Sequence, residues 1–167
     1  MKIQILGHRK AGELARSQPG LLDFVFITNP VDPFELVGSR SIIENCREHI
    51  RRDFEDIELP REKGVHPSFK DIEAILNWVK DRQKWAEEED ILTVSCSAGI
   101  SRSAATAYVI NCMVHEPEAA MSVLDEKIHW PNIEVVEHGA AIMGRPEMKT
   151  LIEAWKARVA LQEPTGW

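Results

Sequence analysis

Apolar residues recur along the first half of this chain in short runs, separated by polar segments that contain Pro and Gly. The N-terminal run alternates apolar with polar residues, which is typical of a half-buried strand, whereas the run at 91–94 is wholly apolar or β-branched, which favours a buried central strand. Segment 41–52 shows neither clear helical nor clear strand periodicity. We predict a strand over 49–56, followed by a loop at 58–67. The pattern predicts strands at 2–6, 21–28, 49–56 and 91–94, with a short helix between the first two.

Helical spacing dominates the second half. Ser68 is a good N-cap with Asp71 three residues on, and apolar residues then recur at helical spacing up to about residue 88. The stretch after Arg102 is rich in alanine, and Pro117 suits the first turn of another helix. The expected helices are 68–88, 103–114, 118–128, 132–143 and 146–161. We therefore expect one α/β domain over residues 1–167, a small central mixed β-sheet flanked by helices, with a helix-rich C-terminal half.

Composition narrows the possible partners. The chain has 167 residues, of which 44% are hydrophobic, and this suffices for one sizeable core. Its formal net charge of −7 is spread along the chain, and no basic stripe alternates with aromatic residues. Nucleic acid and membrane surfaces are therefore not expected as partners. No apolar run approaches the roughly 18 residues of a membrane span.

The cysteines and histidines indicate a compartment and argue against a metal. Three cysteines without regular spacing do not form a disulfide framework, and the apolar N-terminal stretch is too short for a signal peptide. We therefore expect a reducing, cytoplasmic location. The six histidines lack the spacing of metal ligands, so we interpret them as surface or packing residues and expect neither metal nor cofactor.

The segment from Cys96 to Arg102 carries the chemistry. Its residues Cys96-Ser97-Ala98-Gly99-Ile100-Ser101-Arg102 lie between the predicted central strand and an alanine-rich helix. Five residues are enough for backbone N–H groups to curl around a tetrahedral dianion, with the positive end of the helix aimed at it and a glycine allowing close approach. Arg102 can hold two phosphate oxygens with its planar fork. A thiol in such surroundings ionises readily, so we expect Cys96 to act as a nucleophilic thiolate, with Ser103 placed to hydrogen-bond the sulfur.

The sequence contains a control for this spacing. Cys46 and Arg52 are also separated by five residues, but those residues include a glutamate and no glycine, and no Ser or Thr follows Arg52. We interpret this copy as unrelated to phosphate binding. Cys46 could form a disulfide with Cys96 on oxidation, or be an inert thiol.

The Cys96 segment resembles the C-x-A-G-x-S-R-S loop of dual-specificity phosphatases, a branch of the cysteine-dependent protein tyrosine phosphatase superfamily. Pro131-Asn132 is similar to a dipeptide that this branch carries at a comparable distance beyond the loop. The resemblance implies metal-free hydrolysis of phosphomonoesters in an α/β fold, with Ser97, Ala98, Gly99, Ile100, Ser101 and Arg102 binding the phosphate. The family usually has His before the nucleophile, whereas this chain has Ser95, which can still donate a hydrogen bond within the loop.

The same resemblance implies a general acid on a mobile loop upstream of the cysteine. We predict Asp56 in this role, with Asp53, Glu58 and Glu62 as alternatives. The loop side chains at 97–101 carry no charge, which favours phosphotyrosine, phosphoserine or phosphothreonine in a protein, or a small phosphomonoester, as substrate. The alternative to an enzyme is a phosphoprotein-binding module that has lost turnover.

Overall fold

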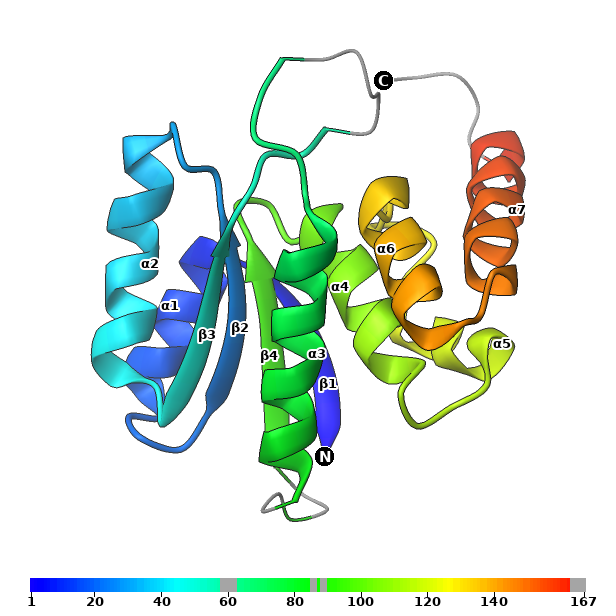
Figure 1. Ribbon diagram of the computed structural model, residues 1–167. Coiled ribbons are helices and arrows are strands. Elements are labelled where there is room, and N and C mark those ends of the chain that lie inside the picture. Colours follow the sequence, from blue (N-terminus) through cyan, green and yellow to red (C-terminus); the bar gives the residue numbers. More distant parts are fainter. Residues whose placement is uncertain (58–62, 85–86, 88–89, 163–167) are drawn as a thin grey trace.

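A four-stranded parallel sheet forms the centre of the molecule (Figure 1). The structure, a computed structural model, describes residues 1–57, 63–84, 87 and 90–162. Its strands are β1 (Lys2–Gly7), β2 (Asp23–Thr28), β3 (Glu48–Asp53) and β4 (Ile91–Cys96), in the spatial order β1-β4-β2-β3. The α/β class is confirmed, but the described strands pair only in parallel, so the expectation of a mixed sheet is wrong.

Helical connections explain why the strands are parallel, because a parallel pair needs a long crossover. The connections contain α1 (His8–Ser17), α2 (Pro33–Asn45) and α3 (Phe69–Gln83). The sequence pattern missed α2, whose start is fixed by Asp32: its side chain accepts the Phe34 N–H, and Pro33 occupies the first turn. The capping box of Ser68 and Asp71 at α3 is confirmed, although α3 ends at Gln83 and not near residue 88.

Strand β2 shows how the sheet is covered on both faces. All of its residues are buried, and alternate side chains enter different clusters. Phe24 and Phe26 pack with α1 and α2 residues such as Ala15, whereas Val25 and Ile27 join the larger core formed with the C-terminal helices. This alternation confirms the predicted layers, with helices flanking the sheet.

The C-terminal half is helical, with one correction. It contains α4 (Arg102–Asn111), α5 (Pro117–Ala120), a 3-10 turn (Met121–Val123), α6 (Ile133–Met143) and α7 (Glu147–Gln162). The predicted helix at 118–128 is wrong beyond its first turns. There the Asp125 side chain accepts the Lys127 N–H, and the His129 ring accepts the Asp125 N–H. These local side-chain contacts compete with helical hydrogen bonding.

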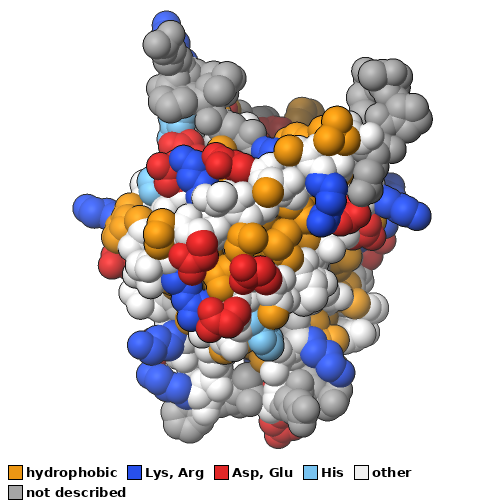
Figure 2. All heavy atoms as spheres, turned by 90° about the vertical axis from the view of Figure 1, so that its right-hand side faces the viewer, with side chains coloured by type: hydrophobic (Ala, Val, Ile, Leu, Met, Phe, Trp, Pro, Cys, Tyr) orange, Lys and Arg blue, Asp and Glu red, His pale blue; other side chains and the backbone are white. Residues whose placement is uncertain are grey.

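The face formed by the C-terminal helices has a mixed surface. Hydrophobic side chains gather across its middle, and acidic and basic side chains lie among and around them (Figure 2). This face therefore has no large field of one sign. Within the described segments, no helix has the length and hydropathy needed to cross a membrane.

Candidate active site

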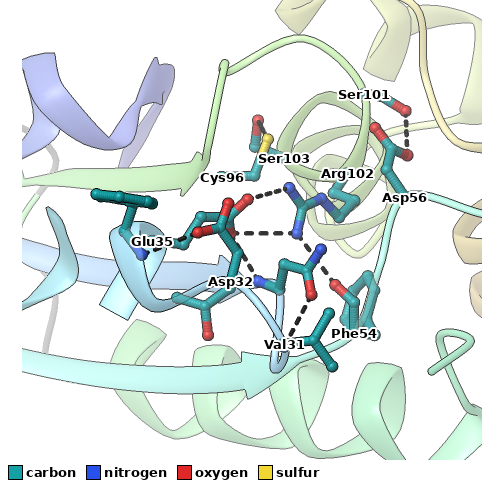
Figure 3. Close-up of polar contacts among 12 residues, drawn as sticks. Val31, Asp32, Glu35, Phe54, Asp56, Cys96, Ser101, Arg102 and Ser103 are labelled. Carbon is teal, nitrogen blue, oxygen red and sulfur yellow. Dashed lines mark hydrogen bonds and ion pairs between the residues drawn. The ribbon is translucent and has the colours of Figure 1, made fainter. Parts of the chain in front are cut away.

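The carboxyl end of β4 leads directly into the predicted phosphate loop. Strand β4 ends at Cys96, residues 97–101 form the loop, and α4 begins at Arg102 (Figure 3). Because all described strands are parallel, the segments that follow β1, β2 and β3 reach the same edge of the sheet. Side chains from these distant segments can therefore meet the loop.

The loop is held from outside by its carbonyl groups. The carbonyl of Ser97 accepts the N–H of His8 (3.2 Å), that of Ile100 the N–H of Trp130 (3.0 Å) and that of Ser101 the N–H of Asn132 (3.4 Å). In a trans peptide the carbonyl and the following N–H point in opposite directions, and no described peptide bond is cis. The N–H groups that follow these carbonyls therefore turn toward the inside of the loop, as an anion cradle requires.

Two glycines let the loop pack against the end of β1. Gly99 has a φ of +77°, and a Cβ there would lie 2.4 Å from the Gly7 nitrogen. In turn, a Cβ on Gly7 would lie 2.9 Å from the Ala98 carbonyl oxygen. A side chain at either position would collide with backbone, so both glycines are needed for this close approach.

The thiol of Cys96 lies at the base of the loop. The residue is 2% exposed, and its Sγ lies 3.1 Å from the Ser103 Oγ. Helix α4 begins without a side-chain cap and has no acidic residue in its first turn. Its positive end therefore lies beside the sulfur, with no carboxylate on the same turn to offset it.

The side chain of Arg102 is held by a carboxylate that the sequence did not reveal. Its Nη2 donates to Glu35 Oε1 (3.0 Å), and its Nη1 lies 3.4 Å from Glu35 Oε2 and donates to the Phe54 carbonyl (3.1 Å). Figure 3 shows Glu35 and Arg102 pointing toward each other. Arg102 Nε is buried and has no partner among the described residues. Glu35 and the Phe54 carbonyl thus orient the guanidinium through both of its Nη atoms.

Comparison with known proteins gives no match by sequence. No family model matches the chain, and no curated protein matches it. Solved structures do match. They include a Cydia pomonella PTP-2 phosphatase (TM-score 0.55, 18% identity, 84% of this chain and 85% of that chain) and human DUSP28 (TM-score 0.54, 14% identity, 96% and 95%). A third is a human tyrosine phosphatase-like serine/threonine/tyrosine-interacting protein (TM-score 0.52, 16% identity, 75% and 78%).

The chain has the dual-specificity phosphatase fold. The expected fold is therefore confirmed, and in it Asp56 lies close to the loop. Its Oδ1 accepts hydrogen bonds from the Ser101 Oγ (2.7 Å) and the Asn132 Nδ2 (2.9 Å). Asn132 also caps α6 and donates to the Ile57 carbonyl, so it ties Asp56 to the start of that helix.

None of the alternative general acids is seen at the phosphate loop in the described part of the chain. Asp53 ends β3, where it accepts hydrogen bonds from Thr28 and Arg51. Glu58 and Glu62 lie outside the described residues, as does the whole first half of the loop, 58–62. Among the described alternatives, only Asp56 contacts the phosphate loop.

Ser95 differs from expectation in this dual-specificity phosphatase fold, whereas the burial of His8 agrees with a packing residue. Ser95 is fully buried, and its Oγ has no partner in the described part of the chain, so the expected hydrogen bond within the loop is not made. His8, interpreted as a surface or packing residue, is buried beside the loop with neither ring nitrogen hydrogen-bonded to a described group.

Cys46 lacks the surroundings that Cys96 has at the phosphate loop. It follows the end of α2, and its Sγ lies 3.3 Å from the His49 Nδ1. Arg52 lies within β3, so no helix begins there. Burial raises the pKa of the Cys46 thiol, and it raises that of Cys112 to about 11. Neither thiol shares the positive environment of the loop.

Proposed function

We propose that this protein hydrolyses phosphomonoesters through a phosphocysteine intermediate, with Cys96 as the nucleophile. The observation that carries the proposal is the loop itself. Three of its carbonyls bond to neighbouring segments, which turns the N–H groups that follow them inward, and a buried thiol and an arginine stand at its two ends. This arrangement supplies donors for three phosphate oxygens and a nucleophile beneath the phosphorus.

The reaction needs two displacements at phosphorus. In the first, the Cys96 thiolate attacks phosphorus, the P–O bond to the substrate breaks, and the leaving oxygen takes the proton of Asp56. In the second, Asp56 takes a proton from water as the water oxygen attacks phosphorus, and the P–S bond breaks. Ser103, 3.1 Å from the sulfur, stabilises the departing thiolate by donating a hydrogen bond. Arg102 and the inward N–H groups bind the phosphoryl oxygens through both steps.

Phosphorylated side chains of proteins are the preferred substrate class in this proposal. Ser97, Ala98, Ile100 and Ser101 place no cation inside the loop that would recognise additional phosphates there. One solved structure of similar fold is PTPMT1 in complex with PI(5)P (TM-score 0.51, 14% identity), and it offers a small phosphomonoester as the second substrate type to assay. The free thiol requires a reducing compartment, which the cytoplasm provides.

A phosphoprotein-binding module is the second candidate. Ser95 replaces the histidine that the resemblance leads one to expect, and its unpartnered hydroxyl supplies no hydrogen bond to order the loop. One structural neighbour is described as a phosphatase-like interacting protein. Under this alternative the loop binds phosphate without turnover.

Turnover of p-nitrophenyl phosphate separates the two candidates. We expect the wild type to hydrolyse it, the Cys96→Ser variant to lose more than about 99% of that activity, and both to gain thermal stability from vanadate. Cys46→Ser is the matched control and should retain wild-type activity. Vanadate binding without hydrolysis would favour the binding module. Residual turnover in Cys96→Ser would exclude a phosphocysteine intermediate.

A further inference from the structure

A pocket of about 350 Å³ lies next to the phosphate loop, on the side of α1 and α2. It shares Ser97 with the loop and Glu35 with the Arg102 ion pair. A phosphate held by the loop would therefore have the pocket beside it. The volume is within the range of small-ligand sites and much larger than one anion needs, so part of a substrate fits there.

Two arginines bring positive charge to the lining of this pocket. Arg9 and Arg16 both contribute to it, and the carboxylates present are Asp32 and Glu35. Glu35 is already neutralised by Arg102. Arg16 donates to the Ser41 hydroxyl (2.6 Å), which also lines the pocket, so this arginine is oriented by an uncharged group. Arg9 forms an exposed ion pair with Glu13 (3.9 Å), which offsets its charge only weakly. Arg16 has no ion pair among the described residues.

The start of α1 adds to this positive character. The helix begins at His8, has no side-chain cap, and has no acidic residue in its first turn. The first N–H groups of a helix have no partner within it, and they favour an anion. By contrast, the Asp32 side chain caps α2 at the same pocket. At α1 no side chain caps the helix, although the first N–H, that of His8, donates to the Ser97 carbonyl (3.2 Å).

His8 gives an independent reason to expect a ligand here. It lines the pocket, it is only 5% exposed, and neither ring nitrogen has a hydrogen-bond partner among the described residues. Burial lowers its pKa to about 4; the charge of Glu35 and a backbone contact with Ile27 act in the opposite sense, and the charges of Arg102 and Arg51 lower it further. The ring is therefore neutral at pH 7. A neutral imidazole has one donor and one acceptor, and leaving both unmade is costly. An unmet group of this kind needs a partner, which is either an ordered water or a ligand.

We propose that this pocket binds a second anionic group, a phosphate or a carboxylate, carried by the leaving part of the substrate. The inference rests on the proposed function, because the first phosphate must occupy the Cys96 loop. Arg9 and Arg16 would bind the second anion, and His8 would donate a hydrogen bond to it. Phe34 is 85% exposed and also lines the pocket, where it can contact the group that joins the two anions.

The test compares substrates that differ by one anion. One pair is a phosphotyrosine peptide with Glu or Gln next to the phosphotyrosine, and the other is an inositol bisphosphate against the matching monophosphate. The measured quantity is the ratio of kcat/KM within each pair. We expect the wild type to prefer the doubly anionic member of at least one pair, and Arg9→Gln or Arg16→Gln to reduce that ratio about tenfold. The pair that shows the preference identifies the source of the anion.

Arg40→Gln is the matched control. Arg40 lies on α2 outside the pocket and forms an exposed i,i+4 pair with Glu44 at 3.8 Å, much as Arg9 does with Glu13 at 3.9 Å. It should leave both ratios unchanged. Equal effects of Arg9→Gln and Arg40→Gln, or no preference in either pair, would overturn the proposal.

His8→Phe separates binding from packing, because it keeps the ring and removes both nitrogens. If His8 only packs, the variant should be at least as stable as wild type and keep the substrate ratio. If His8 binds the anion, the variant stays folded but loses much of the ratio. In the Cys96→Ser background, thermal stabilisation by the same ligands tests the pocket without turnover. If the wild type hydrolyses none of the substrates but the doubly anionic ligand still stabilises Cys96→Ser more than its partner does, the proposed enzyme is rejected and the subsite is kept. If neither hydrolysis nor this binding preference is seen, the subsite is rejected.

Discussion

Replacing Glu35 by glutamine removes the only carboxylate among the described residues that pairs with Arg102, and we expect a large loss of stability. Glu35 Oε1 accepts from Arg102 Nη2, and Oε2 lies 3.4 Å from Nη1 and accepts the Asn29 N–H at 2.6 Å. Both side chains of the pair are at most 7% exposed. Glutamine has one acceptor oxygen, so in either orientation its NH2 group faces a donor. The guanidinium charge is then buried without a counter-charge.

The expected cost follows from that geometry. Breaking a buried ion pair by removing one partner costs about 3–5 kcal/mol, and glutamine keeps one acceptor, so we expect about 3 kcal/mol. For a chain of 167 residues, each kcal/mol corresponds to a Tm change of roughly 2–4 °C. The Tm should therefore fall by about 6–12 °C. Glu44→Gln on the same helix is the control: its carboxylate is 64% exposed at 3.8 Å from Arg40, and we expect a change within about 0.5 kcal/mol.

A double-mutant cycle with Arg102→Met shows whether the pair is the cause. If Glu35→Gln is costly because it leaves Arg102 unpaired, the same change should be nearly neutral or stabilising once Arg102 is absent. The coupling energy from urea unfolding of the four proteins should then be at least about 2 kcal/mol. Additive costs, or a Tm shift below 2 °C for Glu35→Gln, would show that the carboxylate is not needed to balance this charge.

Three further outcomes are expected. Asp56→Asn should lower kcat by about 10²–10⁴ with little change in KM and should flatten the basic limb of the pH–rate profile, and an unchanged profile would exclude Asp56 as the acid. Gly99→Ala places a Cβ 2.4 Å from the Gly7 nitrogen at a φ of +77°, so vanadate should no longer stabilise the variant; wild-type stabilisation would contradict the close packing. The pKa of His8 is about 4 in the folded protein, below its unfolded value, so the unfolded state binds more protons as the pH falls from about 6.5 toward 4. Stability should decrease over that range by on the order of 2 kcal/mol at pH 4.5 and less so in His8→Phe, and identical pH dependence in the two proteins would refute this.

The phosphate loop could be identified from sequence because its signal is local. Cys96 and Arg102 are separated by a fixed number of residues, and the strand before them and the helix after them are both visible in the pattern. The same holds for the N-caps Ser68 and Asn132, where one side chain bonds to the next turn. Contacts between residues close in the sequence can be recognised from the order of residue types.

Contacts between segments far apart in the sequence cannot be recognised in this way. Glu35 lies 67 residues before Arg102, in a helix whose apolar positions follow no clear stripe. A signal did exist: Asp32-Pro33 marks a helix start just after β2, and every parallel strand ends at the same edge. With the fold known, a carboxylate in that first turn becomes a candidate partner for the loop arginine. His8 follows β1 in the same way, but its burial depends on packing that composition does not show.

The close contact of Gly99 with Gly7 links catalysis to the stability of a single edge strand. Strand β1 is one of the two edge strands of the described sheet and pairs with β4 alone, so it opens locally more readily than the central strands β4 and β2. Were it to detach, Gly99 would lose the backbone against which it rests and Ser97 the donor from His8, while β2, β3 and β4 could stay paired. Amide hydrogen exchange in the loop should then follow that of β1 and not the slower exchange of the central strands. Loss of activity would precede loss of the core on warming, and the first seven residues would set the temperature at which it begins.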